Sequence, residues 1–299
     1  MAPRRAGGCG IAAMARTAAA DYPAPMETSP ASPEQPGGGS GEAFAPFAMI
    51  DGDPACGLLI VCDHAENSVP AEYGGLGLPP AEFQRHIAYD PGAAAVARRL
   101  AAELGAPAVF STFSRLLIDA NRGEDDPTLI MRLSDGAVVP GNATVDAAER
   151  ARRIARYHAP YHAAIATAIE RALAAGIVPA LVSLHSFTPV WRGARRSWHA
   201  GVLWDRDPRL AVPLIERLRA DATLVVGDNE PYAGALRNDT MYRHATRRGL
   251  AHALIEIRQD LIADASGISA WSDRLAAILA TLNRDPEIHH VRHYGSQSD

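Results

Sequence analysis

From about residue 46 onward, short apolar segments alternate with longer stretches in which apolar residues recur at helical spacing. The short segments lack strict alternation of apolar and polar positions, which is typical of strands covered on both faces of a sheet. They lie at residues 58–63, 108–113, 116–119, 180–184, 200–203, 223–226 and 253–257. Because strands and helices alternate along the chain, the pattern predicts an α/β fold with a mixed, largely parallel sheet.

The helical patterns lie at residues 91–104, 145–175, 208–219 and 267–283. Gly105 and Gly176 follow the first two patterns, and glycine is the residue that most often follows the end of a helix. Pro160 interrupts the second pattern. Because proline lacks an amide hydrogen and clashes with the preceding turn, we expect a kink or two separate helices there.

The composition divides the chain into three parts. Residues 1–45 are rich in Ala, Pro, Gly and Ser; they cannot bury enough apolar surface to offset the cost of ordering, and we expect a disordered tail. The periodic segments fall within residues 46–288, which we expect to form a single domain. Residues 289–299 are expected to be a flexible C-terminal tail. No run approaches the roughly 18 apolar residues that a membrane span needs, so no membrane partner is expected.

Charge and cysteine usage narrow the function classes. The 299-residue chain has a formal charge of -5, and all 29 of its basic residues are arginine, since it contains no lysine. The absence of lysine excludes Schiff-base chemistry, pyridoxal phosphate attachment and a Walker-type nucleotide site. The mild acidity and the lack of a basic tract argue against nucleic acid as a partner. Cys9, Cys56 and Cys62 show neither zinc-ribbon nor redox spacing, which is typical of a reduced, cytoplasmic protein.

Four predicted strands carry polar or ionisable residues at or near their C-terminal ends. These are Asp63 and His64, then Asp119, Asn121 and Arg122, then His185 and Ser186, and finally Glu256. Each such group would cost about 1–3 kcal/mol if it were buried without a partner, and ligands of α/β folds bind beyond the carboxyl ends of the strands. We therefore expect these side chains to converge on one site.

Two histidines of this set suit a metal ion. His64 and His185 would supply imidazole ligands, and a catalytic zinc site needs a third ligand and an open position for water. The third ligand should be an acid, and the candidates are Asp63, Glu66 and Asp90. Asp90 also precedes a predicted helix and could instead cap its N-terminus, and either histidine alone could be a hydrogen-bonded core residue.

Glu256 lies within an apolar strand, where burial raises the pKa of a carboxyl group toward the range that suits a general base. An internal ion pair with an arginine is the alternative interpretation. Arg115, Asn121 and Arg122 offer donors for a substrate carboxylate or a developing oxyanion. A structural ion pair would explain either arginine equally well.

The segment YHAPYH places His158 and His162 four residues apart, with Pro160 between them. A metal pair on a helix face is one interpretation; contacts to substrate, or hydrogen bonds to groups around the metal, are the interpretation we favour. Ser186 has no G-x-S-x-G sequence around it, so we expect it to bind substrate rather than act as a nucleophile. Residues 229–232 are interpreted as a loop at the rim of the site.

Six segments, taken in order, resemble the N-formylglutamate amidohydrolase family. They read CDHAENSVP, HIAYDPGA, SRLLIDANR, YHAPYH, SLHSF and IEIRQDL, and the resemblance covers roughly residues 55–285. Members of this family are similar to zinc carboxypeptidases and aspartoacylase. The resemblance therefore implies a three-layer α/β/α sandwich of the phosphorylase/hydrolase-like type.

The resemblance also implies a set of metal ligands. His64 and His185 would bind the metal, expected to be zinc, and Asp90 would complete the site because an aspartate at this place belongs to the family pattern. The wider group has His-x-x-Glu, whereas this chain has Asn67 three residues after His64 and a glutamate at Glu66. Glu66 is therefore kept as the reserve ligand.

By the same resemblance Glu256 would be the catalytic base, Arg115 would polarise the scissile carbonyl, and Asn121 with Arg122 would hold a substrate carboxylate. The expected reaction is metal-dependent hydrolysis of N-formyl-L-glutamate, a small molecule of histidine catabolism, to formate and glutamate. One alternative is hydrolysis of a different N-acyl amino acid or a small peptide. The other is a catalytically silent binding protein on the same scaffold. The oligomeric state is not predicted.

Overall fold

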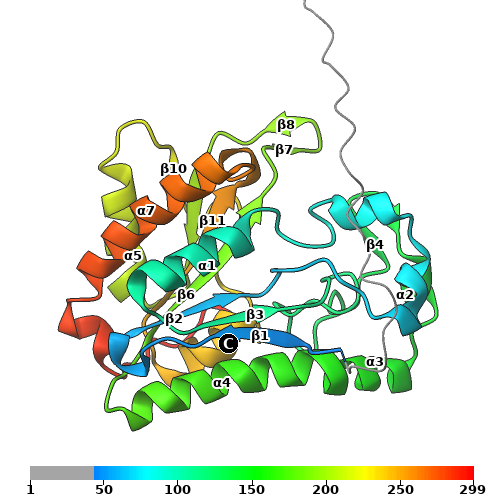
Figure 1. The fold of residues 1–299 in the computed structure, drawn as a ribbon, viewed down its shortest axis with the longest axis horizontal. Helices are drawn as coiled ribbons and strands as arrows, with labels where there is room; N and C mark the ends of the chain where they lie inside the picture. Colours follow the sequence, from blue (N-terminus) through cyan, green and yellow to red (C-terminus); the bar gives the residue numbers. More distant parts are fainter. Residues whose placement is uncertain (1–43) are drawn as a thin grey trace, which may run out of the picture. The chain divides into compact units, whose positions relative to one another are not determined.

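Seven strands form the central sheet of this protein, in the order β1–β3–β2–β6–β11–β9–β10 (Figure 1). The strands are β1 (Phe47–Ile50), β2 (Leu58–Cys62), β3 (Ala108–Ser111), β6 (Ala180–Phe187), β9 (Ala200–Leu203), β10 (Val226–Asp228) and β11 (His252–Arg258). The structure, a computed structural model, describes residues 44–299. The tail expected at residues 1–45 lies, apart from its last two residues, outside the described residues.

Parallel pairing dominates the sheet. The four adjacent strands β3, β2, β6 and β11 are parallel to one another, and β10 is parallel to β9. The edge strand β1 is antiparallel to β3, and β9 is antiparallel to β11. The prediction of a mixed, largely parallel sheet is confirmed.

Helices cover both faces of the sheet. One face carries α1 (Ala93–Leu104), α5 (Pro208–Arg219) and α7 (Ala265–Leu282), and the other carries α4 (Ala159–Ala174) and α6 (Thr240–His244) (Figure 1). Successive side chains of a strand point to opposite faces, so Ile60 and Ile255 belong to the core beneath α1, whereas Val61 and Leu254 belong to the core beneath α4. The fold is a three-layer α/β/α sandwich.

The predicted helices are found, with one change. The pattern at residues 145–175 becomes α3 (Ala147–Arg153), a π-helical turn (Ile154–His158) and α4. The amide of Ala159 bonds to the carbonyl of Ile154, one residue further back than in an α-helix. This wide turn lies just before Pro160, which has no amide hydrogen to offer. Figure 1 shows α3 and α4 running nearly in line, so the proline marks a bulge rather than a break.

The strand predicted at residues 116–119 is wrong, because this apolar segment is a buried turn. Its carbonyl groups bond to side chains that come from another part of the chain. Asn142 donates to the carbonyl of Leu116 at 2.8 Å, and the buried Arg153 donates to that of Leu117 at 2.9 Å. These donors replace the neighbouring strand that an apolar run would otherwise require.

The strand predicted at residues 223–226 is shifted along the chain, since β10 begins only at Val226. β6 continues to Phe187, past the predicted end at residue 184, so His185 and Ser186 lie inside the strand. β1 is an additional edge strand that the hydrophobic pattern did not indicate.

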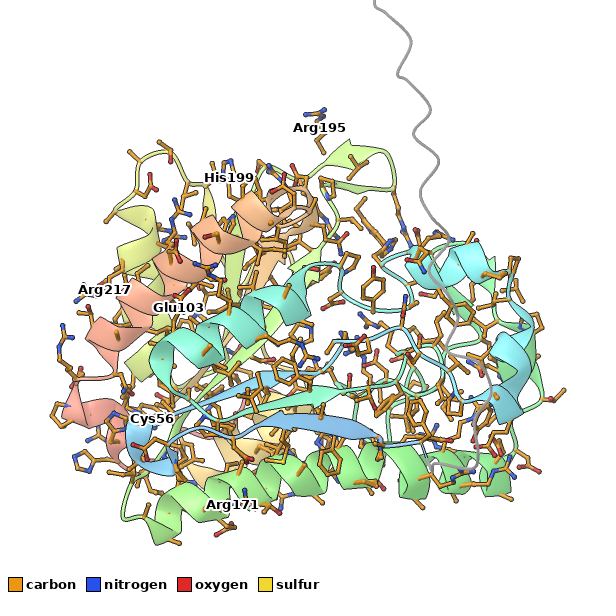
Figure 2. The ribbon with its side chains drawn as sticks, viewed as in Figure 1. Cys56, Glu103, Arg171, Arg195, His199 and Arg217 are labelled. Carbon is orange, nitrogen blue, oxygen red and sulfur yellow. The ribbon has the colours of Figure 1, made fainter. Side chains whose placement is uncertain are left out.

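Short elements surround one end of the sheet. They are the hairpin of β4 (Leu133–Ser134) with β5 (Ala137–Val138), the hairpin of β7 (Val190–Trp191) with β8 (Ala194–Arg195), and α2 (Pro140–Ala143). The side chain of Arg195 projects outward from its hairpin (Figure 2). None of the helices in the described part of the chain has the length and hydropathy required to cross a membrane.

The C-terminal segment 289–299 contacts the rest of the described unit. The amide of Arg292 donates to the carbonyl of Gly249 at 2.8 Å, and the amide of Gln297 donates to the carboxylate of Asp205 at 3.0 Å. The flexibility expected for this segment stays a prediction, and these contacts count against it.

Candidate active site

A cavity of about 270 Å³ opens where β2, β6 and β11 end. Ligand pockets typically measure roughly 300–1,000 Å³, so this cavity suits a small molecule. His64 follows β2, His185 lies near the end of β6, and Glu256 lies near the end of β11; all three line the cavity. The convergence expected from the strand ends is therefore present.

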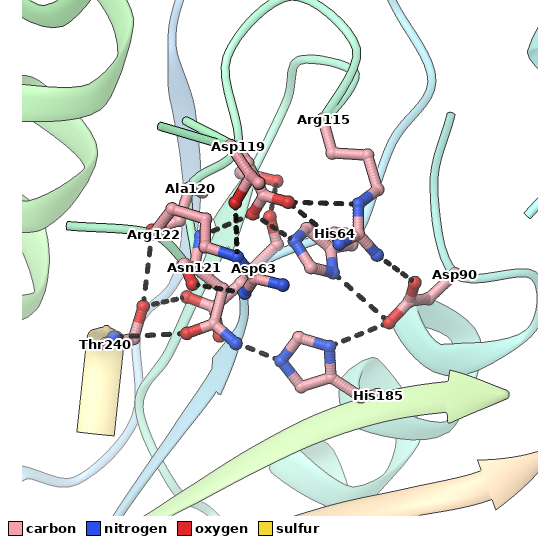
Figure 3. Close-up of polar contacts among 12 residues, drawn as sticks. Asp63, His64, Asp90, Arg115, Asp119, Ala120, Asn121, Arg122, His185 and Thr240 are labelled. Carbon is pink, nitrogen blue, oxygen red and sulfur yellow. Dashed lines mark hydrogen bonds and ion pairs between the residues drawn. The ribbon is translucent and has the colours of Figure 1, made fainter. Parts of the chain in front are cut away.

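His64, Asp90 and His185 form the one group among residues 44–299 whose donor atoms could hold a metal ion, with one ligand atom from each within 4.8 Å of the others. Nδ1 of His185 lies 2.7 Å from Oδ2 of Asp90, and Nδ1 of His64 lies 3.4 Å from the same oxygen (Figure 3). All three side chains are buried. The two Nδ1 atoms and one carboxylate oxygen thus face a common point.

Backbone contacts hold Asp90 in this group. Its amide donates to the carbonyl of His64 at 3.0 Å, and its Oδ2 accepts the amide of Ser186 at 3.3 Å. The residue at the N-cap of α1 is Gly92, and no side chain caps that helix. The alternative interpretation of Asp90 as a helix cap is therefore wrong.

Two further carboxylates orient the histidine rings. Nε2 of His64 donates to Asp119 at 2.7 Å, and Nε2 of His185 donates to Asp63 at 3.0 Å (Figure 3). An ionised carboxylate only accepts hydrogen bonds, so each Nε2 carries a proton, while each Nδ1 faces Asp90. Partners of this kind fix the orientation and tautomer of metal-binding histidines.

Asp63 is itself held by buried donors. Its oxygens accept hydrogen bonds from Tyr161 and Ser183. They also accept hydrogen bonds from Thr240 and His185, which Figure 3 labels. Burial alone would raise the pKa of Asp63, but the hydrogen bonds and the nearby histidines lower it well below its usual value. Sequence reasoning had named Asp63 only as a possible ligand. The position of Asp63 directly before His64 is the one feature of the sequence that could have indicated this orienting role.

The buried carboxylates also act on His185. Burial by itself lowers the pKa of this imidazole, but the hydrogen bonds to Asp63 and Asp90 outweigh it and raise the pKa well above its usual value. Asp90 responds in the opposite direction: its pKa is held far below its usual value, since His64 and His185 overcome the effect of burial. His64 and His185 therefore favour the ionised form of the Asp90 carboxylate between them.

Glu256 lies next to the group on the adjacent strand, since it is in register with His185 in the parallel pair of β6 and β11. It is 6 % exposed, and its Oε2 has no hydrogen-bond partner among the described residues. Burial is the main cause that raises its pKa to about 7. No ion pair involves Glu256 within residues 44–299, so the alternative interpretation of an internal salt bridge finds no support.

Arg115, predicted to be catalytic, and Asn121 and Arg122, predicted to bind substrate, border the cavity. Arg115 is paired with Asp119 at 2.8 Å and lies 3.5 Å from Asp90, so the ion pair considered as an alternative does form (Figure 3). Arg122 lines the cavity with its nearest carboxylate, that of Asp126, 4.0 Å away. Asn121 also lines the cavity, and its Oδ1 accepts a backbone amide from the start of α6.

His158 and His162 do not line the cavity. Nε2 of His162 lies 3.1 Å from Nε2 of His158, and its Nδ1 lies 2.9 Å from Nε2 of His244. Burial lowers the pKa of all three imidazoles. The structure therefore shows no position from which His158 or His162 could contact a substrate in the cavity. His158 instead bonds to the carbonyl of Arg122 at 2.9 Å, behind the cavity wall.

Two other predicted residues take different positions. Glu66, the reserve ligand, is exposed and pairs with Arg98 at 3.3 Å, outside the group of possible metal ligands. Ser186 lines the cavity, but its hydroxyl donates to the carbonyl of Pro91 at 2.9 Å and accepts from Gln259 at 3.2 Å. This serine therefore ties the segment after Asp90 to β6.

The loop at residues 229–232 forms part of the cavity wall, as the sequence suggested, with Tyr232 among the lining residues. Gly201 is in register with Glu256 on the neighbouring strand. A Cβ atom at Gly201 would collide with the carbonyl oxygen of Glu230. Glycine at this position lets the loop lie directly on the sheet beside Glu256.

The three-layer α/β/α sandwich brings polar groups from several strand ends into one cavity, which is where proteins of the α/β class bind their ligands. The sequence profile of the family described as N-formylglutamate amidohydrolase matches residues 56–263. The chain belongs to this family and is an amidohydrolase.

Two solved structures are similar to the chain. The gene product Atu2144 of Agrobacterium tumefaciens is 35% identical, with a TM-score of 0.75, over 80% of this chain and 95% of its own. The N-formylglutamate amidohydrolase of Ralstonia eutropha JMP134 is 23% identical, with a TM-score of 0.61, over 80% of this chain and 98% of its own. At that identity the second likeness shows the fold alone. No curated protein matches the chain.

Proposed function

We propose that this protein is a metal-dependent hydrolase that cleaves the amide bond of N-formyl-L-glutamate or a related N-acyl amino acid. The observation that carries the proposal is the buried group of His64, Asp90 and His185 beside Glu256, whose Oε2 lacks a partner. Membership of the amidohydrolase family supports the reaction class.

The donor set fits a divalent ion, and zinc is the ion we expect. Two imidazole nitrogens and one carboxylate oxygen are the three protein ligands of a catalytic zinc site that keeps a position open. The rings are already oriented by Asp63 and Asp119, as metal-binding histidines usually are. When bound, such an ion lowers the pKa of a coordinated water to about 7 and polarises a carbonyl group.

The remaining steps belong to the residues of this chain. Oε2 of Glu256 would accept a proton as water attacks the acyl carbon and would then deliver it to the nitrogen of the leaving amine. Arg115, which Asp119 holds in place at 2.8 Å, would stabilise the developing oxyanion. Arg122 and Asn121 would hold the carboxylate of the amino acid.

The cellular setting is part of the same proposal. A small-molecule substrate suits the cavity volume of about 270 Å³. Cys56 and Cys62 are both free thiols in the described part of the chain, which fits a reduced cytoplasmic compartment. A role in histidine catabolism would follow if N-formyl-L-glutamate is the physiological substrate.

Formate release from N-formyl-L-glutamate, with and without a chelator, tests the proposal. We expect activity to disappear on chelation and to return with added zinc. Glu256→Gln should retain bound zinc and lose at least about 100-fold in kcat, the lower range for a general base. Equal formate release from fully metal-free protein would refute the mechanism.

A pair of matched variants tests the ligand set. Asp90→Asn should lose bound metal, measured by elemental analysis of the purified protein. Glu66→Gln, which neutralises the exposed reserve ligand, should retain both metal and activity. The opposite result would move the acidic ligand from Asp90 to Glu66.

A further inference from the structure

The cavity extends along the sheet away from the metal-ligand group. His252, Leu254 and Glu256 alternate on β11 and so point to the same face, and all three line the cavity. At about 3.3 Å per residue, Leu254 lies roughly 7 Å and His252 roughly 13 Å along the strand from Glu256.

Apolar side chains line this extension. Leu203 is in register with Leu254 on β9, and Met241 comes from the start of α6 and belongs to the same buried cluster. Both line the cavity. We call Leu203, Met241, Leu254 and His252 the apolar arm.

His252 brings no charge to the apolar arm. Its Nδ1 lies 2.9 Å from the carbonyl of Leu250, and its Nε2 lies 3.3 Å from the hydroxyl of Thr246. Burial is the main cause that lowers the pKa of this imidazole. A carboxylate placed in the apolar arm would therefore lose its hydration without gaining a cation.

Two arginines are among the residues that line the cavity. Of the two arginines among the lining residues, Arg115 is paired with Asp119, which leaves Arg122 to hold a substrate carboxylate. Asp239 also lines the cavity, two residues before Met241, and accepts the amide of Tyr242 at 2.7 Å. Asp239 supplies no positive charge that could hold a second carboxylate of the substrate.

We propose that the apolar arm binds an apolar group of the substrate, so that N-acyl amino acids with one carboxylate and one apolar chain are preferred to N-formyl-L-glutamate. The inference rests on the proposed amide hydrolysis and specifies its substrate class. Each buried methylene is worth about fourfold in affinity. A chain of three or four carbons should therefore give a preference of at least tenfold.

The experiment compares kcat/KM of the zinc-loaded protein for three compounds. N-formyl-L-leucine carries the apolar group on the amino acid, N-butanoylglycine carries it on the acyl group, and N-formyl-L-glutamate is the reference. We expect at least one of the first two to exceed the reference by tenfold or more, and the better one shows which group enters the arm. A value for N-formyl-L-glutamate equal to or above both overturns the proposal while leaving amide hydrolysis in place.

Calorimetric binding to Glu256→Gln separates this proposal from the proposed function. One possible result is that an apolar compound binds at least tenfold more tightly than N-formyl-L-glutamate, while the parent protein hydrolyses none of the compounds. This result would refute the proposed hydrolysis and support the apolar arm. Tighter binding of N-formyl-L-glutamate would overturn the arm, whichever compound is hydrolysed.

Matched variants on one strand locate the effect. Leu254→Ala should reduce the ratio of kcat/KM for N-formyl-L-leucine over N-formylglycine by at least tenfold. Ile255→Ala removes a buried side chain from the opposite face of β11 and should leave that ratio unchanged. An equal change of the ratio in both variants would overturn the assignment of Leu254 to the arm.

Discussion

Replacing Asp63 by asparagine tests how the histidine rings are oriented. The carboxylate accepts four hydrogen bonds, from His185 at 3.0 Å, Ser183 at 3.1 Å, Tyr161 at 2.9 Å and Thr240 at 2.5 Å. The amide of asparagine has one accepting oxygen and one donating nitrogen. In Asp63→Asn, at least one side of the group therefore sets donor against donor.

The magnitude follows from the bond to His185. If the amide nitrogen faces Nε2, the proton of the ring must move to Nδ1, the atom that faces Asp90 and the expected metal. The lost charge-assisted hydrogen bond is worth about 1.5–3 kcal/mol. We therefore expect the zinc affinity of Asp63→Asn to fall by about 10- to 100-fold, the range found for partners of metal-binding histidines.

Zinc titration in competition with a chromogenic chelator measures this change, and thermal unfolding in parallel shows whether the variant is folded. Tyr161→Phe is the matched control, because it removes one donor to Asp63 and leaves the bond to His185 in place. Its zinc affinity should stay within about threefold of the parent, because the hydrogen bond between Asp63 and His185 remains. A folded Asp63→Asn protein that binds zinc as tightly as the parent would refute the reasoning.

Two further predictions concern stability. Burial raises the pKa of Asp239 to about 7 despite the amide hydrogen bond from Tyr242; its contribution to stability is therefore lost as the pH rises from about 4 through about 7. Asp239→Asn keeps an oxygen that can accept the amide of Tyr242, and it should raise the free energy of unfolding above about pH 8 by up to roughly 4 kcal/mol. Urea titrations over a range of pH measure this free energy. The same pH dependence in the parent and in the variant would contradict the prediction. Arg153→Ala removes the donor to the carbonyl of Leu117 and should lower the free energy of unfolding by about 3–5 kcal/mol. The exposed neighbour Arg152→Ala should change it by no more than about 0.5 kcal/mol, and equal losses would refute the buried role.

The strand ends were the most informative part of the sequence. His64, His185 and Glu256 each follow or close an apolar run, and the structure brings all three to one cavity. This could be predicted because parallel strands present their carboxyl ends at the same edge of a sheet. Most helices and strands could be predicted for a similar reason, because apolar periodicity depends on residues that are close together in the chain.

Other features could not be predicted from neighbouring residues. The apolar segment at residues 116–119 was interpreted as a strand, yet Asn142 and Arg153 satisfy its carbonyl groups from a later part of the chain. His158 and His162 were expected to contact the substrate or to bond to groups around the metal. They instead contact each other and His244, 82 residues beyond His162, and they do not line the cavity. In both cases the partner is distant in sequence.

The sequence by itself determined which side chains are candidates for the chemistry, because side-chain type and strand position are local properties. Only the tertiary structure decided what each acid does. Asp90 lies against the two imidazoles, Asp63 and Asp119 hold the far sides of the rings, and Glu66 is left at the surface. A carboxylate takes its role from the donors around it, and those donors come from strands and helices that meet only when the sheet is assembled.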